Sequence, residues 1–342
     1  MAPATGDKPD IPAFSNRLRK NLAHWQRWAR RRGISCYRIY DRDVPQFPFA
    51  IDWFATVSPR VEVHLHVQEI DTGWQRTDAE YTAWLIAVCD AIRTVCVVPA
   101  ARLHLKRRER QRGTSQYEKL GAEPQTFVVE ETGHRFEADF DTYLDMGLFL
   151  DHRPGRMLVA SNIAARVANG EPVAFLNLFA YTGSFSVYAA KAGAKRSVTV
   201  DLSNTYQAWA ARNFALNGID AQAHVLVRAD VFAWLADAEL HAGLFDVIVL
   251  DPPSFSNSKK MQGVLDVQRD HALLIRRCHA LLSTRGELFF STNLRSFELD
   301  PELGGALGLR EITHQSVPED FKRPSRPPPH RAWTVKRQSS GS

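Results

Sequence analysis

The sequence VAFLNLFAYTGSFSVYAAKAGAKRSVTVD, residues 173–201, contains an apolar strand, a turn with one glycine, a short helix and a second apolar strand that ends in an aspartate. A short apolar run bounded by turn residues is typical of a strand that is buried on both faces. Strand, helix and strand in this order indicate a parallel βαβ unit with a right-handed crossover. The sequence therefore predicts an α/β fold around this segment.

The same alternation continues toward the C-terminus. The periodicity predicts three further strands at residues 224–227, 245–250 and 287–290, and helices at residues 184–192, 204–217, 231–238 and 266–282. Such a pattern indicates a doubly wound parallel sheet with helices on both faces. Because ligands of this architecture bind beyond the carboxyl ends of the strands, function is to be sought in the residues that follow each strand.

Three aspartates follow three of these strands. Asp201, Asp230 and Asp251 each close a strand, and Gly183 lies in the turn after the first one. Gly183 lets the backbone approach a ligand, and the helix that begins at Ser184 presents free N–H groups there. One acid at a strand end is usually a helix N-cap, but three beside a glycine turn favour a ligand site. A single glycine fits the dinucleotide-binding fingerprint poorly.

The preceding part of the chain has a different pattern. Residues 14–32 predict a basic helix with Ser15 as its N-cap and Gly33 as its stop. Alternating strands at residues 34–70, a helix at 77–94 and strands at 101–105, 126–130 and 134–138 follow. We therefore expect a disordered N-terminus at 1–13, an α+β domain at 14–155 that would pass for a binding module, an α/β domain at 156–337 and a flexible tail at 338–342.

Basic residues are concentrated along the chain. The 342 residues contain 43 Lys and Arg against 38 Asp and Glu, a net charge of +5. Residues 17–32 and 322–336 contain no acidic residue, and residues 102–112 contain only Glu109. Any one of these segments could be an ordinary solvated face, but three on an acidic body favour a polyanionic partner such as nucleic acid.

Several classes of protein are disfavoured. No apolar run approaches the roughly 20 residues that span a bilayer, and residues 1–12 lack the apolar core of a signal peptide. The four cysteines form no C-x-x-C pair and have no histidine at zinc-finger spacing. We expect a reduced, cytoplasmic protein that binds neither a membrane nor a metal, whose oligomeric state cannot be read from the sequence.

Short motifs in both halves carry a family resemblance. The chain resembles the class I S-adenosylmethionine-dependent methyltransferases, and within them the ribosomal RNA large-subunit family, especially the K half of the bifunctional K/L proteins that makes N7-methylguanosine in 23S RNA. The resemblance covers residues 14–335 and rests on NLFAYTG at 177–183, DPPSFSNSK at 251–259, DVQRDH at 266–271, SNRLRKNL at 15–22, RERQ at 108–111, QYEKL at 116–120 and DMGLFLDHR at 145–153. The RNA-binding THUMP domain and the second methyltransferase of those proteins have no counterpart here, which implies a stand-alone version.

The resemblance implies a Rossmann-like methyltransferase domain with S-adenosylmethionine as cofactor. Segment 145–153 would lie at the methionine end, the turn 179–184 would contact the methionyl part, Asp201 the ribose hydroxyls and Asp230 the adenine amino group. Carboxylates suit both tasks because they accept charge-assisted hydrogen bonds. The implied cofactor residues are Phe149, Asp151, Arg153, Asn177, Phe179, Tyr181, Thr182, Gly183, Ser184, Asp201, Leu202, Asp230 and Asp251.

The segment Asp251-Pro252-Pro253-Ser254-Phe255 is the expected catalytic motif. Two prolines fix the backbone and remove two donors, which gives a stiff turn after the strand. Methyltransferases that modify base nitrogens carry a similar motif there, with an aromatic residue after the second proline. Here Ser254 takes that position and Phe255 follows, so the residue that stacks on the target base stays open. We assign the catalytic roles to Asp251, Pro252, Pro253 and Phe255.

The target atom can be argued from chemistry. Methylation at C5 of a pyrimidine requires a covalent nucleophile, normally a thiolate. Related enzymes carry that cysteine after the fifth strand, where this chain has residues 289–293, FFSTN, and the nearest thiol is Cys278 in the preceding helix. Guanine N7 has an in-plane lone pair and loses no proton, so alignment matters more than a base. Asp251 would hold the guanine edge and stabilise the cationic product ring.

Other functions stay open at this point. The chain could methylate another position, such as cytosine C5, an exocyclic amine or a protein side chain, or it could be a non-catalytic RNA-binding assembly factor. The expected partner is 23S ribosomal RNA in domain V, either free or in an assembly intermediate, with the target base single-stranded or flipped out. Tyr181, Phe255 and Trp333 are candidates for stacking, although Trp333 has the pattern of a buried strand residue. We expect the domain at 14–155 to bind RNA and recognise the substrate. The expected RNA contacts are Arg17, Arg19, Lys20, Lys106, Arg107, Arg108, Arg110, Arg112, Lys259 and Lys260.

Overall fold

The computed structural model describes residues 10–70, 77–108, 125–143, 145–236, 243–256, 263–324 and 326–337. The chain divides into two compact units. Unit 1 comprises Met1–Gly133 and Ala138–Met146, and unit 2 comprises His134–Glu137 and Gly147–Ser342. The main break between the units therefore follows Met146, nine residues before the boundary expected from the sequence.

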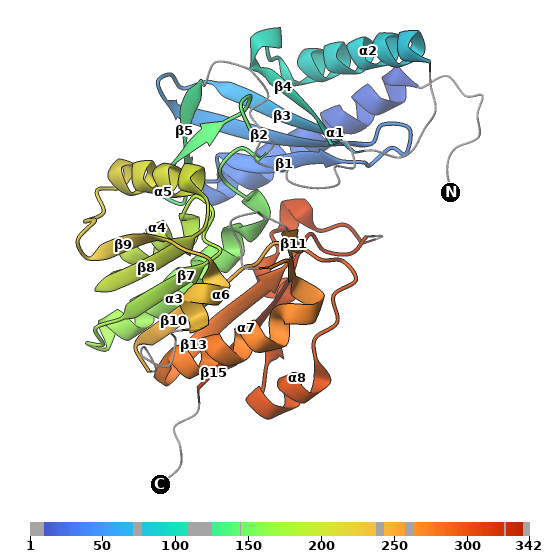
Figure 1. Ribbon diagram of the computed structural model, residues 1–342. Coiled ribbons are helices and arrows are strands. Elements are labelled where there is room, and N and C mark those ends of the chain that lie inside the picture. The colour runs from blue at the N-terminus through green and yellow to red at the C-terminus, as the bar shows by residue number, and fades with distance from the viewer. Residues whose placement is uncertain are drawn as a thin grey trace. The chain divides into compact units, whose positions relative to one another are not determined.

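Unit 1 is built on a mixed sheet with the strand order β4-β3-β2-β5-β6, in which β1 also pairs with β2 (Figure 1). The strands are β1 (Cys36–Asp41), β2 (Phe49–Ser58), β3 (Val63–Ile70), β4 (Leu103–Arg108), β5 (Thr126–Glu131) and β6 (His134–Asp139). Helix α1 (Ile11–Arg32) and helix α2 (Asp78–Cys96) pack on each other, and the 3₁₀ turn η1 (Ala100–Arg102) leads into β4. The predicted α+β character is confirmed.

Helix α1 begins earlier than the sequence pattern indicated. Asp10 is its N-cap, because the Asp10 carboxylate accepts a hydrogen bond of 2.8 Å from the Ala13 N–H. Ser15 therefore lies within the helix, and the prediction that it caps the helix is wrong. Pro12 fits the first turn, where its missing N–H leaves no bond unmade. Gly33 ends the helix in the left-handed conformation, as predicted.

Unit 2 is a seven-stranded sheet with the order β14-β15-β13-β10-β7-β8-β9. The five strands β13, β10, β7, β8 and β9 pair in parallel, whereas β15 is antiparallel to β13 and β14 is antiparallel to β15. The sheet strands are β7 (Ala174–Leu178), β8 (Arg196–Asp201), β9 (His224–Arg228), β10 (Phe245–Leu250), β13 (Leu282–Thr292), β14 (Arg310–Glu311) and β15 (Arg331–Lys336). The predicted Rossmann-like sheet is confirmed.

Helices cover both faces of this sheet (Figure 1). One face packs on α3 (Arg153–Ala168) and α4 (Ser184–Lys191), and the other packs on α6 (Val231–Ala236) and α7 (Val267–Leu281). The remaining elements are η3 (Leu150–His152), α5 (Asn204–Leu216), β11 (Phe255–Ser256), β12 (Leu265–Asp266), α8 (Pro301–Leu307), α9 (Thr313–Ser316) and η5 (Glu319–Phe321). Among the described residues, no helix is long and apolar enough to cross a membrane.

The strand register brings the candidate residues to one edge of the sheet. Leu178 pairs with Leu250 on one side and with Val200 on the other, and Leu250 pairs with Phe290. The residues that follow β7, β8, β10 and β13 therefore meet at the carboxyl edge of the sheet, where β7 lies between two neighbours whose connections run in opposite directions. The candidate site residues are therefore found at this edge.

Candidate cofactor and base site

The turn after β7 has an unusual backbone. Phe179, Tyr181 and Gly183 have φ angles of 55°, 53° and 75°, so two residues with side chains adopt the left-handed conformation. Such strain persists only where the surrounding structure holds it, and it is common at ligand sites. The turn is closed by a hydrogen bond of 2.9 Å from the Gly183 N–H to the Ala180 carbonyl. Residues 179–183 thus form a rigid surface at the sheet edge.

Asp201 holds this turn in place. Its Oδ2 accepts a hydrogen bond of 2.9 Å from the Tyr181 N–H, and its Oδ1 accepts one of 2.8 Å from the Ser203 N–H. Burial raises the pKa of Asp201 to about 6, against the opposing effect of these two N–H donors. Each carboxylate oxygen has a second lone pair. Asp201 can therefore orient the turn and still accept hydrogen bonds from a diol such as the ribose hydroxyls.

Segment 147–149 lies against the same turn, as the resemblance implies. The Gly147 N–H donates to the Tyr181 hydroxyl at 2.9 Å, and the Thr182 hydroxyl donates to the Gly147 carbonyl at 2.6 Å. The ring of Phe149 lies 4.9 Å from that of Tyr181 and is 42% exposed. An exposed aromatic surface beside a rigid turn is suited to an apolar or cationic part of a ligand.

Two of the predicted cofactor residues support the turn from within the protein. Asn177 is buried and its amide nitrogen donates to the Ser186 hydroxyl at 3.0 Å. Thr182 is also buried, with its hydroxyl bound to Gly147. Ser184 is half-buried at the start of α4, and among the described residues no side chain caps that helix. Its first-turn N–H groups therefore suit an anionic group such as a carboxylate.

Two other predicted residues make protein contacts of their own. The carboxylate of Asp230 accepts a hydrogen bond of 2.9 Å from the Phe232 N–H and so caps α6. The guanidinium of Arg153 forms a buried ion pair with Asp320, with N–O distances of 3.2 and 3.3 Å. Leu202, beside Asp201, is half-buried. Direct contacts of these three residues with a cofactor stay predictions.

Asp251 lies directly after β10. Its Oδ1 accepts a hydrogen bond of 2.6 Å from the Ser291 hydroxyl on β13, and its side chain is 27% exposed. Pro252 is buried and Pro253 is half-buried, which fits a stiff turn. Phe255, on β11, is 57% exposed and is thus accessible to a base. The predicted catalytic segment therefore presents a fixed carboxylate and an exposed aromatic ring.

Two histidines near Asp251 were not predicted. His152 Nε2 lies 3.7 Å from Asp251 Oδ2, and the ring of His152 stacks on that of His330 with centroids 4.1 Å apart. His330 Nδ1 lies 3.3 Å from Asp151 Oδ2. Because 178 residues separate the two histidines, no local pattern could have paired them. The sequence did offer one indication of a role for His152, because this residue lies inside segment 145–153, which was expected at the methionine end of the cofactor.

The basic residues fall into three groups. Arg17, Arg19 and Lys20 lie exposed on α1 and fit the prediction of phosphate contacts. Lys106 does not, because it is buried and its ammonium donates to the Asp141 carbonyl at 2.6 Å. Burial lowers the pKa of Lys106 accordingly. The side chains of Arg107 and Arg108, and residues Arg110, Arg112, Lys259 and Lys260, lie outside the described part of the chain.

The basic segment 322–336 uses much of its charge within unit 2. Arg331 pairs with Glu311 at 2.8 Å, and Lys336 lies 3.8 Å from Glu287. Trp333 is 2% exposed in the core of the sheet. Because these charges are paired within unit 2, the segment is less suited to phosphate binding than its composition indicates. Trp333 cannot stack on a base because it is buried.

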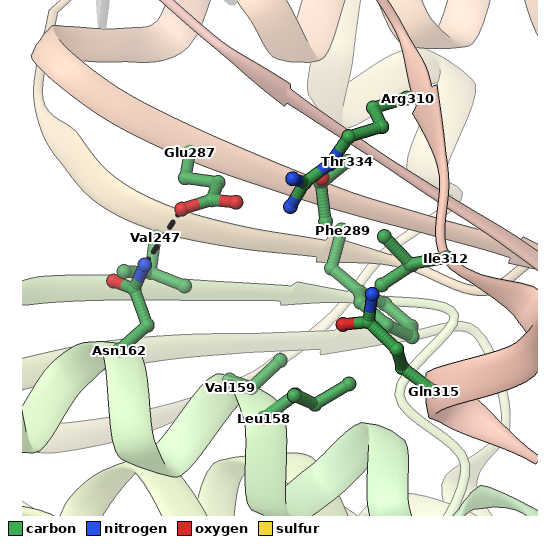
Figure 2. Close-up of a pocket in the computed structure, with 10 residues that line it drawn as sticks. All are labelled: Leu158, Val159, Asn162, Val247, Glu287, Phe289, Arg310, Ile312, Gln315 and Thr334. Carbon is green, nitrogen blue, oxygen red and sulfur yellow. Dashed lines mark hydrogen bonds between the residues drawn. The ribbon is translucent and has the colours of Figure 1, made fainter.

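A cavity of about 180 Å³ lies elsewhere in unit 2, between helices α3 and α9 and the sheet face formed by β10, β13, β15 and β14 (Figure 2). Its apolar wall comes from Leu158, Val159 and Phe289 among others, and its polar side contains Glu287, which accepts a hydrogen bond of 2.6 Å from the Asn162 amide. None of the predicted site residues lines this cavity. It is therefore separate from the site at the carboxyl edge.

The residues at the carboxyl edge fit S-adenosylmethionine. The strained turn, the exposed ring of Phe149 and the lone pairs of the Asp201 carboxylate suit a nucleoside that carries a sulfonium group and an amino acid end. Asp251 lies at the same edge, where the acceptor would meet the methyl group. The arrangement can thus bind a methyl donor and orient a second molecule toward it.

Comparisons with known proteins agree with this fit. Residues 79–330 match the family model described as S-adenosylmethionine-dependent methyltransferase. The ribosomal RNA large subunit methyltransferase K of Neisseria meningitidis is 50% identical over 330 residues, which cover 96% of this chain and 88% of that protein. The K/L protein of Marinobacter nauticus is 43% identical, and the chain spans 44% of its length.

Solved structures share the fold. A methyltransferase crystallised with S-adenosylhomocysteine is 23% identical, with a TM-score of 0.72, over 97% of this chain and 83% of that one. A methyltransferase of Streptococcus mutans is 22% identical, with the same TM-score and the same coverage. At these identities the likeness concerns the fold alone.

Proposed function

We propose that this chain, which belongs to the S-adenosylmethionine-dependent methyltransferases and within them to the ribosomal RNA large subunit methyltransferase K family, methylates guanine N7 in 23S ribosomal RNA. The observation that carries the choice of atom is the environment of Asp251. The carboxylate is fixed by Ser291 at the sheet edge. Neither residues 251–256 nor residues 289–293 contain a cysteine.

The chemistry of N7 suits this environment. S-adenosylmethionine supplies an electrophilic methyl group on a cationic sulfur. The N7 lone pair forms a bond to the methyl carbon, the C–S bond breaks, and its electrons stay on sulfur. No proton leaves, and the guanine ring becomes cationic. An anionic Asp251 that is held in place stabilises the developing charge and needs no proton transfer.

Cysteine placement argues against cytosine C5. Cys278 is fully buried in α7, and burial raises the pKa of its thiol, which opposes formation of a thiolate. Cys36 and Cys96 are buried in unit 1, as part of β1 and α2. Residues 289–293 carry the Ser291 hydroxyl where a C5 enzyme would need its nucleophile. Methylation of an exocyclic amine of a base remains the alternative to methylation of N7, and identification of the product distinguishes the two.

The substrate base must leave its stack to reach the sheet edge. The exposed ring of Phe255 could receive it, and the basic face of α1 suits the flanking phosphates. We expect free 23S RNA or an assembly intermediate as substrate, in the cytoplasm. A flipped purine would then meet Asp251 with its N7 edge.

The proposal is tested by mapping the product. Purified protein is incubated with labelled S-adenosylmethionine and unmodified 23S RNA, and the methylated nucleoside is identified by mass spectrometry. We expect N7-methylguanosine at one position in domain V. An N-methylated exocyclic amine or 5-methylcytidine would refute the assignment of the atom. Absence of S-adenosylmethionine binding by calorimetry would favour a non-catalytic assembly factor.

The role of Asp251 has its own test. Asp251→Asn retains the size of the side chain and removes its charge, so we expect a large loss of kcat in a protein that still binds the cofactor. Full activity in Asp251→Asn would show that the charge does not stabilise the product ring.

A further inference from the structure

The stacked pair His152 and His330 lies beside the proposed catalytic carboxylate and has no part in the function so far. His152 comes from η3, just before α3, and His330 directly precedes β15. Both rings are buried, with residue exposures of 6% and 2%. Burial of a polar ring costs solvation free energy unless its nitrogen atoms are hydrogen-bonded, so the polar contacts of these two rings need an explanation.

His330 is held at both ring nitrogens. Nδ1 lies 3.3 Å from Asp151 Oδ2, and Nε2 lies 3.0 Å from the Ser316 hydroxyl. Because a carboxylate oxygen only accepts, Nδ1 carries a proton. These two contacts fix the position and the orientation of the His330 ring, which turns its face to His152.

His152 has one ring nitrogen with a polar neighbour. Nε2 lies 3.7 Å from Asp251 Oδ2, whereas Nδ1 is buried without a hydrogen-bond partner among the described residues. A proton on Nδ1 would stay unpaired, and a bare Nε2 would face a carboxylate, so the geometry favours the Nε2–H form. Burial lowers the pKa of His152, which keeps its ring neutral.

A shared metal ion does not fit the two rings. Asp151, His152 and His330 do offer ligand atoms within 4.8 Å of one another. A histidine nitrogen binds a metal along its lone pair, which lies in the plane of the ring. The two ring planes are inclined by only 12° and their centroids are 4.1 Å apart, so the lone pairs lie in two separate, nearly parallel planes and do not converge on one ion. Hydrogen bonding explains the pair better.

We propose that His152 is a positioning residue for Asp251, and that His330, anchored by Asp151 and Ser316, fixes the His152 ring for this task. The inference rests on the proposed function, in which Asp251 faces the guanine. The distance of 3.7 Å is longer than a hydrogen bond. Hydrogen bonds at catalytic groups are often long in free enzymes and tighten in the substrate complex.

Two neutral donors have a specific consequence for Asp251. Ser291 donates to Oδ1, and the Nε2–H of His152 faces Oδ2. Neither donor carries a charge, so the carboxylate is oriented without being neutralised. Its negative charge then remains for the cationic methylated base. A lysine or arginine in place of His152 would also orient Asp251, but its positive charge would offset the negative charge that stabilises the methylated base.

The test compares His152→Phe with His152→Gln. Phenylalanine keeps an aromatic face against His330 but lacks a donor, whereas the glutamine amide places an N–H near the position of Nε2. We expect His152→Phe to lower kcat by about 10- to 100-fold, which corresponds to the loss of one hydrogen bond to a charged group, with S-adenosylmethionine affinity and melting temperature unchanged. We expect His152→Gln to recover most of kcat. Wild-type kcat in His152→Phe, or an equal loss in both variants, overturns the proposal.

The anchor is tested by His330→Phe, which keeps the ring face and removes the contacts to Asp151 and Ser316. We expect a lower kcat at unchanged cofactor affinity, and wild-type kcat would overturn the anchoring role. Activity that is lost on dialysis against EDTA and returns with Zn²⁺ would overturn the hydrogen-bond explanation. Product mapping with the wild-type protein keeps this test separate, because methylation of another atom refutes the proposed function while the variants still report on positioning.

Discussion

Replacing Gly183 by alanine tests whether the turn after β7 is limited by space. Gly183 and Gly170 have φ angles of 75° and 80°, so alanine costs about 1–2 kcal/mol of backbone strain at either position. At Gly170 a Cβ would meet nothing within 4 Å, whereas at Gly183 it would lie 3.1 Å from Ala210 Cβ. Overpacking of this kind costs about 1–3 kcal/mol more. Gly183→Ala should therefore destabilise unit 2 by about 2–5 kcal/mol.

The assay is urea-induced unfolding of both variants, with S-adenosylmethionine affinity measured by calorimetry. Gly170→Ala is the matched control for strain alone and should bind the cofactor like the wild type. Gly183→Ala should unfold at lower urea and bind more weakly, because the turn must move away from α5. Equal destabilisation of the two variants would refute the argument from space, and unchanged affinity in Gly183→Ala would separate the turn from the cofactor.

Three further predictions concern the cofactor site and the basic face of α1. Gly147→Ala places a Cβ 2.3 Å from the Trp209 ring at a φ of 104°, so we expect a lower melting temperature and weaker S-adenosylmethionine binding. Burial raises the pKa of Asp201 to about 6, so the ionised carboxylate, and with it cofactor affinity, should fall as pH falls through 6, while affinity in Asp201→Asn should be weak and independent of pH. Calorimetry between pH 5 and about 8 measures both. Neutralising Arg17, Arg19 and Lys20, which are exposed on α1, should leave cofactor affinity unchanged in calorimetry. It should reduce the slope of log K for RNA binding against log[salt], measured by filter binding, by about 0.7–0.9 per lost phosphate contact.

The sheet, and the edge at which the candidate residues gather, could be predicted because both follow from local patterns. Apolar runs such as residues 245–250 are buried on both faces of a parallel sheet, so their strand assignment does not depend on distant residues. The acids that follow them are placed at one edge by topology alone. Helix α3 was not predicted, because Pro154 and Gly155 resemble helix breakers. Pro154 lies in the first turn, where proline is tolerated, and a Cβ at Gly155 would lie 3.2 Å from the Phe289 ring.

The prediction that Lys106 contacts RNA is wrong, and the reason lies in the strand that contains it. Lys106 was expected to contact RNA as part of the basic segment 102–112, but it belongs to β4. Successive side chains of a strand point to opposite faces, and Lys106 shares the buried face with His104. The ammonium is then satisfied by the Asp141 carbonyl, which lies 35 residues away in sequence and is invisible to a local count of charges.

The three acids at strand ends show how a helix-capping role and a ligand role can coexist. Asp201 accepts from two backbone N–H groups, Asp230 caps α6, and Asp251 accepts from a hydroxyl. A carboxylate has about four acceptor positions, and one or two such bonds leave capacity for a ligand. The local bonds fix each carboxylate before a ligand arrives, which reduces the entropy lost on binding. Capping at Asp230 is therefore no argument against adenine recognition. The variant Asp230→Asn separates the two roles, because asparagine still caps a helix. We expect this variant to lose cofactor affinity without losing stability.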